Sequence, residues 1–318
     1  MIRSPADLGT CKVVGTQSPP FPVQSSELNG QDMSFWKLGP EQLALDEDVR
    51  ASGKVATRLH AVPMTSPHHQ LDITASKFGG DPYAEAGDDW PMLHQQPYDF
   101  VAQLNLRDSF ASPTSCYDLI TIFVYWRALE GPESFASDDV LDKACVVRSY
   151  REPAAEKAVS LTRPPARNAN DYRVVPCAAD CQQAMSYPSP FGSSFLKIPA
   201  IARLANQQSD ESQSNLWKMF NWLGCLAFRT NKCLAVQELY LRSLKRVAGP
   251  DWRSETTQIG GYPSIVHDDT FDDDDLFFVG QIAHEPLANF CIGDAAPLLI
   301  AAHVSAPEKF ECDPWQSH

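Results

Sequence analysis

Residues 98–106 read YDFVAQLNL, and residues 119–126 read LITIFVYW. Both runs are rich in β-branched and aromatic residues, which favour strands over helices. Shorter runs of the same character predict further strands, at residues 145–147, 173–176, 276–282 and 297–304. The chain is therefore expected to form a sheet from strands that are spread over most of its length.

Helical patterns are fewer than strand patterns. Two adjacent stretches, residues 214–229 and 232–248, place apolar side chains about every 3.6 residues, and Gly249-Pro250 ends the second. A shorter helix is predicted to begin at Pro40 and to end before Gly53. Strands on both sides of a helical pair predict an α+β fold with mainly antiparallel sheets, and they argue against a doubly wound sheet.

A motif occurs twice in the chain. Gly79-Gly80-Asp81-Pro82 precedes FVAQL at residues 100–104, and Gly260-Gly261-Tyr262-Pro263 precedes FVGQI at residues 278–282. The repetition predicts a duplicated unit that forms two related half-domains with the helical pair between them.

The repetition also sets the expected boundaries. Residues 1–72 are expected to form a Pro-rich N-terminal extension with one short helix, and residues 73–318 the main domain. Within that domain, the two pseudo-repeats are predicted at about 73–180 and 250–318, with a helical insert at about 212–249.

Size and charge limit the functions that the chain can have. The protein has 318 residues, of which 43% are hydrophobic, so it can bury a full core and is not globally disordered. Its 26 Lys and Arg residues against 40 Asp and Glu give a net charge of −14. Direct binding to nucleic acid or to an anionic membrane is unfavourable for such a protein, because both are polyanions.

The expected compartment is the cytoplasm. The longest strongly apolar run covers residues 119–126, much shorter than the about 20 residues of a membrane-spanning helix. No apolar core typical of a secretory signal is seen near the N-terminus. The nine cysteines are scattered, which suits buried thiols in a reducing cytosol better than a disulfide scaffold.

Motifs for catalysis or metal binding are scarce. The Gly-Gly-x-Pro turns do not match a phosphate-binding loop, and no G-x-S-x-G or H-E-x-x-H motif is present. Cys177 and Cys181 resemble half of a zinc site without its second pair, and His68-His69 has no evident companion. His267 and His284 lie beside acids, an arrangement more typical of ordinary hydrogen-bonded histidines. No catalytic residue, cofactor or metal is therefore expected.

An acidic segment stands out near the C-terminus. It reads HDDTFDDDD at residues 267–275, and its carboxylates repel one another, which favours a solvated loop. The loop could be idle, or it could bind calcium, although the spacing of an EF-hand is not met. A third interpretation is mimicry, in which the carboxylates occupy a basic groove where a partner expects phosphates. The middle of the chain is locally basic, so any acidic surface is one face of the molecule.

The repeated motif resembles the signature of the YwqG-like family of bacterial proteins. The resemblance rests on residues of both halves: Gly79, Gly80, Pro82, Trp90, Pro91, Gln103, Gly260, Gly261, Pro263, Gln281, Gly293 and Asp294. The second half agrees less closely than the first. The family implies an α+β fold of repeated antiparallel units and no assigned catalytic residue. Some relatives resemble antitoxins encoded near secreted toxins, including immunity proteins of the type VI secretion system of the TsiT kind.

That resemblance leads to the functional hypothesis. The chain is expected to be an immunity protein that binds and neutralises a cognate secreted toxin, best a nuclease effector, by occluding its basic surface. The residues expected to bind this partner are those of the acidic segment: Asp268, Asp269, Phe271, Asp272, Asp273, Asp274 and Asp275. The alternatives are an uncharacterised enzyme with its active site between the half-domains, and a plain scaffold that the acidic segment keeps soluble.

Overall fold

The computed structural model describes ten stretches of the chain: residues 40–64, 71–110, 116–126, 143–164, 174–190, 192–207, 231–249, 256–264, 275–292 and 297–313. Contacts divide the chain into two units, Met1–Gly39 and Pro40–His318, and every described residue belongs to the second.

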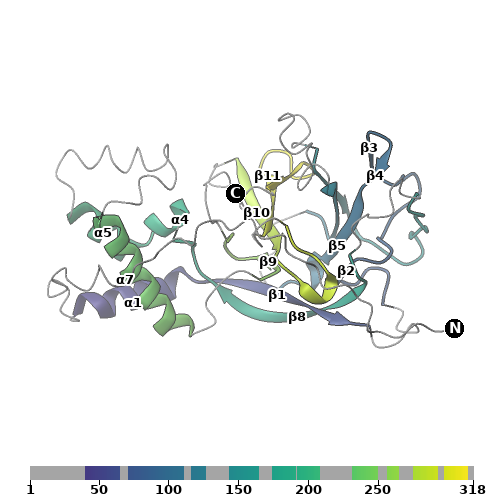
Figure 1. Ribbon diagram of the computed structural model, residues 1–318. Coiled ribbons are helices and arrows are strands. Elements are labelled where there is room, and N and C mark those ends of the chain that lie inside the picture. The colour runs from purple at the N-terminus through teal and green to yellow at the C-terminus, as the bar shows by residue number, and fades with distance from the viewer. Residues whose placement is uncertain are drawn as a thin grey trace, which may run out of the picture. The chain divides into compact units, whose positions relative to one another are not determined.

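A ten-stranded antiparallel sheet dominates the described fold, and Figure 1 shows its arrangement. Its first strands along the chain are β1 (Lys54–Pro63), β2 (Lys77–Phe78), β5 (Asp99–Asn105), β6 (Leu119–Val124) and β7 (Cys145–Tyr150). The later ones are β8 (Cys177–Ser186), β9 (Gln258–Gly260), β10 (Leu276–Ile282), β11 (Leu298–His303) and β12 (Phe310–Asp313). A separate hairpin consists of β3 (Met92–Leu93) and β4 (Gln96–Pro97).

The strand order is β12-β11-β10-β9-β1-β8-β2-β5-β6-β7, with similar arrangements on the two sides of the central pair β1 and β8. At its centre, β1 pairs with β8 over the whole of both strands, from Lys54 opposite Ser186 to Pro63 opposite Cys177. Figure 1 shows these two long strands side by side. On their outer sides, β1 pairs with the short β9 and β8 with the short β2. The edge strands β7 and β12 approach each other, so the sheet is nearly closed and barrel-like.

This architecture corrects the expected fold class. The prediction of an α+β fold with two related half-domains and a helical pair between them is wrong, because the structure is mostly one antiparallel sheet with few helices. The reason lies in β1 and β8. β1 precedes the first copy of the motif, but it pairs with β9 beside the second copy. β8 precedes the second copy, but it pairs with β2 beside the first. Because β1 and β8 also pair with each other, both copies belong to one continuous sheet.

Most of the predicted strands are confirmed. The predictions at 98–106, 119–126, 145–147, 276–282 and 297–304 correspond to β5, β6, β7, β10 and β11. The strand predicted at 173–176 is wrong in its described part, because residues 174–176 have no regular structure. Of the strands in the main sheet, the sequence patterns miss β1, β2, β8, β9 and β12, and β1 lies in the stretch assigned to the N-terminal extension.

The helices form a smaller layer with its own core. They are α1 (Pro40–Ser52), α4 (Ser193–Leu196), α5 (Pro199–Gln207) and α7 (Asn231–Ala248), which confirms the predicted helices at 40–52 and 232–248. The helix predicted at 214–229 lies outside the described residues. On α7, Val236, Tyr240 and Leu244 recur at the spacing of one helical face, and all three are buried.

The main core fills the inner face of the sheet. It gathers buried side chains from most strands, including Leu59, Phe78, Ile122, Val279 and Ile300. A second, aromatic cluster that includes Trp90 and Phe123 packs on the outer face of β5 and β6. Because both of its faces are covered, β6 is buried at every position, which explains why all its residues except Thr121 are apolar.

Candidate functional site

The acidic segment lies almost entirely outside the described residues. Of the residues expected to bind a partner, Asp268, Asp269, Phe271, Asp272, Asp273 and Asp274 fall in the undescribed stretch 265–274. Asp275 is described: it is exposed, directly precedes β10, and its carbonyl accepts a hydrogen bond from Val304 N at 2.8 Å. The role of this segment stays a prediction.

The Gly-Gly turns have a structural reason for their glycines. Gly79 and Gly80 have φ angles of 57° and 76°, and Gly260 and Gly261 have 69° and 79°. Only glycine adopts this left-handed region readily. A Cβ on Gly79 would also lie 2.7 Å from the carbonyl oxygen of Val174. These turns therefore shape the backbone at two corners of the sheet.

Gln103 ties the first corner together. Its side chain is fully buried and its Oε1 accepts a hydrogen bond from Tyr83 N at 2.7 Å. Its Nε2 donates to the carbonyls of Ile73 and Ala75, both at 2.8 Å. One amide thus satisfies backbone groups on both sides of the Gly-Gly turn, and we call this arrangement the Gln103 corner.

Gln281 does the same at the second corner. It is fully buried, and its Oε1 accepts from Ser264 N at 2.9 Å. Its Nε2 donates to the carbonyl of Thr256 and to the hydroxyl of Ser264, both at 2.9 Å. We call this arrangement the Gln281 corner.

A further pair of hydrogen bonds matches between the corners. The Ser76 hydroxyl accepts from Asn105 N at 2.9 Å, and the Thr257 hydroxyl accepts from Ala283 N at 3.1 Å. Each hydroxyl residue lies directly before the short strand, and each donor lies two residues after the glutamine. These matches support the predicted duplication, although within one sheet and not as two half-domains.

The remaining motif residues also have structural contacts. Trp90 is buried, and its Nε1–H donates to the carbonyl of Tyr98 at 2.8 Å, while Tyr98 N donates to the Pro91 carbonyl at 3.1 Å. Pro82 is buried and Pro263 half-buried. Gly293 and Asp294 lie outside the described residues. The described motif residues therefore make contacts that stabilise the fold.

The corners differ in the residues that come after the glutamine. Four residues after Gln281, the Glu285 carboxylate accepts hydrogen bonds from the Thr257 hydroxyl at 2.6 Å and from Ala61 N at 3.3 Å. Burial raises the pKa of Glu285 above its usual value, and the hydrogen bond from Thr257 offsets part of that rise. This carboxylate binds the β1 backbone beyond Arg58, the last β1 residue that pairs with β9.

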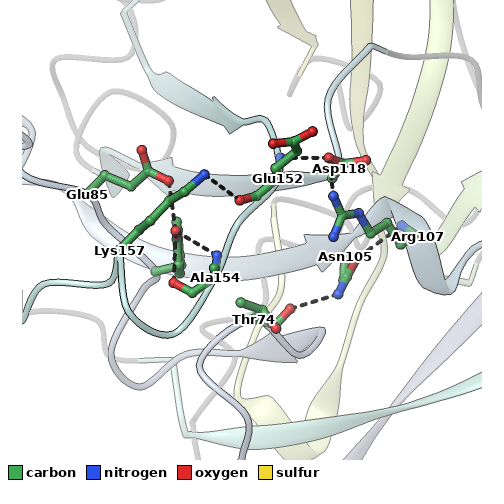
Figure 2. A network of polar contacts seen from close by, with 9 residues as sticks. Thr74, Glu85, Asn105, Arg107, Asp118, Glu152, Ala154 and Lys157 are labelled. Carbon is green, nitrogen blue, oxygen red and sulfur yellow. Dashed lines mark hydrogen bonds and ion pairs between the residues drawn. The ribbon is translucent and has the colours of Figure 1, made fainter.

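At the equivalent position of the first corner lies Arg107. Its guanidinium contacts the Asp118 carboxylate at 2.7 Å, and that carboxylate also accepts from Glu152 N at 2.7 Å. Figure 2 shows Arg107 directed at Asp118 with Glu152 beside it. Arg107 follows β5 in the short 3-10 helix η4 (Leu106–Asp108). No described contact brings it to the backbone of β8.

The rest of the network in Figure 2 fixes surface loops to the outer face of the sheet. Tyr83 Oη donates to Glu85 at 2.8 Å and accepts from Ala154 N at 3.2 Å. Lys157 Nζ donates to the Glu152 carbonyl at 2.8 Å. These bonds hold charged side chains in fixed positions near the end of the Gln103 corner.

Carboxylates gather near Cys181 on β8. Burial raises the pKa of the Cys181 thiol, and the carboxylates of Asp108 and Asp180 raise it further. The pKa of Asp108 is itself raised by burial and by Asp72. We call Asp72, Asp108 and Asp180 the acidic cluster. All three are exposed, so the cluster is open to a partner.

Lys77 lies next to this cluster on β2. It is only 7% exposed, and burial lowers its pKa, while Asp81 and Asp72 oppose that shift. The Gln281 corner has Gln258 at the same position, two residues before the first glycine of its Gly-Gly pair. The Gln103 corner therefore carries a buried cation that the Gln281 corner lacks.

Neither a metal centre nor a membrane-spanning helix is found among the described residues. In that part of the chain, no group of His, Cys, Asp or Glu side chains is arranged to hold a metal ion. Cys177 and Cys181 both lie on β8, His284 is exposed, and His68, His69 and His267 are outside the described stretches. No described helix has both the length and the apolar character that a membrane crossing requires.

A family of known proteins matches most of the chain. It is described as "Domain of unknown function (DUF1963)", and the match covers residues 76–306. It begins at Ser76, shortly before Gly79, and it contains both Gly-Gly pairs together with Gln103 and Gln281. No curated protein matches the chain.

Proposed function

The chain belongs to the DUF1963 family, and we propose that it acts as an immunity protein. It binds a cognate secreted bacterial toxin and blocks it by occlusion, and a nuclease effector with a basic surface fits best. The observation that carries this proposal is the concentration of carboxylates. The net charge is −14, the segment 267–275 is strongly acidic, and the acidic cluster is exposed.

Electrostatics links these carboxylates to a nuclease. A protein that binds DNA or RNA carries Lys and Arg on its binding surface, because phosphate contacts supply much of its affinity. An acidic partner is steered to such a surface, and association rates rise at low salt. A protein that covers the surface then excludes the nucleic acid by competition.

The fold suits such a role. The described motif residues stabilise the corners of the sheet, so the exposed loops and strand edges are available for binding. The Asp118 and Tyr83 networks hold the nearby loops in place (Figure 2). A preorganised surface loses less conformational entropy on binding than a floppy one.

The test is inhibition of a captured toxin. The tagged full chain is used to capture a partner from a lysate of its own cells, and the partner is released in high salt and assayed for cleavage of DNA and RNA. We expect cleavage that stops when the wild-type chain is added back. A variant with Asn at Asp268, Asp269 and Asp272 to Asp275 should inhibit at least tenfold more weakly at low salt.

A matched control keeps the experiment specific. Glu238→Gln and Glu308→Gln remove charge from described residues outside the acidic segment and the acidic cluster, and they should leave inhibition nearly unchanged. A released partner without toxic activity would contradict the immunity role. Equal inhibition by the wild type and the Asn variant at every salt concentration would remove the segment from the mechanism.

The alternative of an enzyme is weaker in one respect. Its expected active site lies between two half-domains, and the continuous sheet removes that boundary. A buried carboxylate whose pKa is raised, that of Glu285, is the feature that favours an enzyme. Both of its oxygens already accept hydrogen bonds from the protein, which favours a structural role.

A further inference from the structure

The central strands β1 and β8 each turn alternate backbone groups away from the other. Leu59 N donates to Thr257 O at 2.9 Å and Ala179 N donates to Ser76 O at 3.4 Å, both outside the β1–β8 ladder. In an antiparallel pair these directions alternate along each strand. The N–H groups of Ala61 on β1 and of Cys181 and Gln183 on β8 therefore point away from the ladder as well.

On β1 this outward side is closed. The short β9 covers Ala56 to Arg58, and the Glu285 carboxylate accepts the N–H of Ala61 at 3.3 Å. The next outward position is Pro63, which has no N–H. Proline and covering side chains are common ways in which proteins protect a strand edge from further pairing.

On β8 no described residue pairs with the outward side beyond Ala179. The short β2 pairs only with Cys177 and Ala178. Within the described stretches, no hydrogen bond is made by the N–H of Cys181 or of Gln183. The side chains of Gln183 and Met185 are exposed, Met185 by 43%. We call Cys181–Met185 the open β8 edge.

The open edge results from the difference between the corners. The residue equivalent to Glu285 is Arg107, and Arg107 binds Asp118 instead of a β8 backbone group. No described side chain thus takes the role at Cys181 that Glu285 has at Ala61. Among the described residues, the β1 edge is thus capped and the β8 edge is not.

Charge restricts the segments that can bind there. Asp108 and Asp180 raise the pKa of the Cys181 thiol, so their negative potential reaches the edge, and Asp72 acts on Asp108. A carboxylate like that of Glu285, supplied by another molecule, would be repelled by these groups. A backbone carbonyl is neutral and can accept the same N–H groups, and Lys or Arg side chains beside it would be attracted.

We propose that the open β8 edge binds an extended, Lys- or Arg-containing segment of a partner protein as an added strand. Backbone groups of the segment pair with Cys181 and Gln183, and its cationic side chains lie near Asp108 and Asp180. Strand addition of this kind takes affinity from main-chain hydrogen bonds and specificity from alternate side chains. The proposal rests on the proposed function only in assuming a basic partner.

The experiment uses the purified full chain and a defined peptide. The probe is a fluorescein-labelled Lys-Val-Lys-Val-Lys-Val peptide with blocked ends, and its binding is followed by fluorescence anisotropy in low salt. We expect saturable binding, and amide exchange at Cys181 and Gln183 should slow at least tenfold when the peptide is bound. A Glu-Val peptide of equal length, and the Lys-Val peptide N-methylated at alternate residues, should bind at least tenfold more weakly.

Variants of the chain separate backbone pairing from side-chain contact. Gln183→Pro removes the outward N–H and copies Pro63 of β1, and it should weaken peptide binding at least tenfold. Gln183→Ala keeps the N–H and should bind within twofold of the wild type. Circular dichroism and thermal unfolding show whether each variant folds. If Gln183→Pro does not, the comparison of the N-methylated and unmodified peptides decides the question on the wild-type chain.

The charge contribution is tested with Asp108→Asn and Asp180→Asn. Each should weaken binding about threefold and flatten its dependence on salt, since surface pairs are screened. Glu238→Gln on α7 is the matched control and should change neither quantity.

Some outcomes would overturn the proposal. They are equal affinity for the Lys-Val and Glu-Val peptides, equal affinity for the N-methylated peptide, or slowed exchange at other strands instead of β8. Because the peptide assay needs no toxin, its failure is distinct from a failure of the immunity role. Successful inhibition of a nuclease with no peptide pairing would place the interface elsewhere.

Discussion

The Gln103 corner and the Gln281 corner use the same hydrogen bonds to build the same backbone, yet their surroundings differ. Both have a buried glutamine, a left-handed Gly-Gly pair and a hydroxyl residue before the short strand. The Gln281 corner adds Glu285, which caps the neighbouring β1 edge. The Gln103 corner has Arg107, Lys77 and the acidic cluster in the corresponding region.

Two kinds of residue are distinguished in this way. Those that the corners share are needed to fold the sheet, because the same residue types satisfy the same backbone groups in both. Those that differ are not part of this shared framework, and some of them are available for function. The surface beside the Gln103 corner is therefore the more promising binding region, and the Gln281 corner is its internal control.

The largest effects are expected from the shared glutamines. Gln103→Leu leaves Tyr83 N and the carbonyls of Ile73 and Ala75 without their partner, and each buried unsatisfied group costs about 1–3 kcal/mol. We expect a loss of about 3 kcal/mol or more in the free energy of unfolding, measured with urea. Gln281→Leu should cost a similar amount, since it orphans equivalent groups.

An exposed glutamine provides the control for that pair. Gln183→Leu should change stability by no more than about 0.5 kcal/mol, because its side chain is exposed. If one corner tolerated the leucine at under about 1 kcal/mol while the other did not, the two corners would not be structurally equivalent.

A smaller effect is expected from opening the capped edge. Glu285→Ala leaves Ala61 N–H and the Thr257 hydroxyl without an acceptor, and we expect a loss of about 1–2 kcal/mol. Amide exchange at Ala61 should also speed up, so that the β1 edge becomes like the β8 edge. Unchanged exchange at Ala61 would mean that Glu285 does not close this edge.

The pH dependence of Glu285 has a defined sign. Its pKa is raised in the folded protein, so the folded state holds this proton more tightly than the unfolded chain. The stabilisation is complete below about pH 4.5 and is lost as the pH rises through the folded pKa. Relative to the non-titrating Glu285→Gln variant, the wild type should therefore lose stability over that range, by about 1.4 kcal/mol per unit of pKa shift.

The smallest effect is expected when a residue of one corner is replaced by its counterpart in the other. Lys77→Gln copies Gln258 and removes a buried cation whose pKa is lowered by burial. We expect a gain of about 1 kcal/mol in the free energy of unfolding at pH 7. The gain should shrink toward about pH 10, where the wild-type lysine loses its proton more readily in the folded state. A loss of stability would show that Lys77 has a stabilising partner.

Parts of the sheet could be predicted because their side chains carry the signal. β6 is buried on both faces and is apolar except for Thr121, and β5 and β10 combine aromatic residues with the repeated glutamine. The Gly-Gly turns were recognisable because a left-handed backbone requires glycine. These features also led to the prediction of a duplication.

The central strands could not be predicted in the same way. β8 reads CAADCQQAMS, and β1 has only one large aliphatic side chain among its buried positions, Leu59. Their stability comes from pairing with each other along their whole length, a long-range property that local patterns do not contain. Missing both strands led directly to the wrong prediction of two half-domains.

The candidate site was equally hard to foresee. The acidic segment is obvious in the sequence, but Asp72, Asp108 and Asp180 are scattered in the chain and interact only in the folded protein. An open strand edge depends on which backbone groups find partners. No residue pattern reports that directly.

The pairing of β1 with strands much later in the chain has a consequence for synthesis on the ribosome. β1 needs Cys177–Ser186 on one side and Gln258–Gly260 on the other, and both are made long after it. Until they emerge, the nascent chain exposes an unpaired strand, and such intermediates aggregate readily. The protein therefore completes its sheet late in translation, and a chaperone that shields β1 until then would raise its yield.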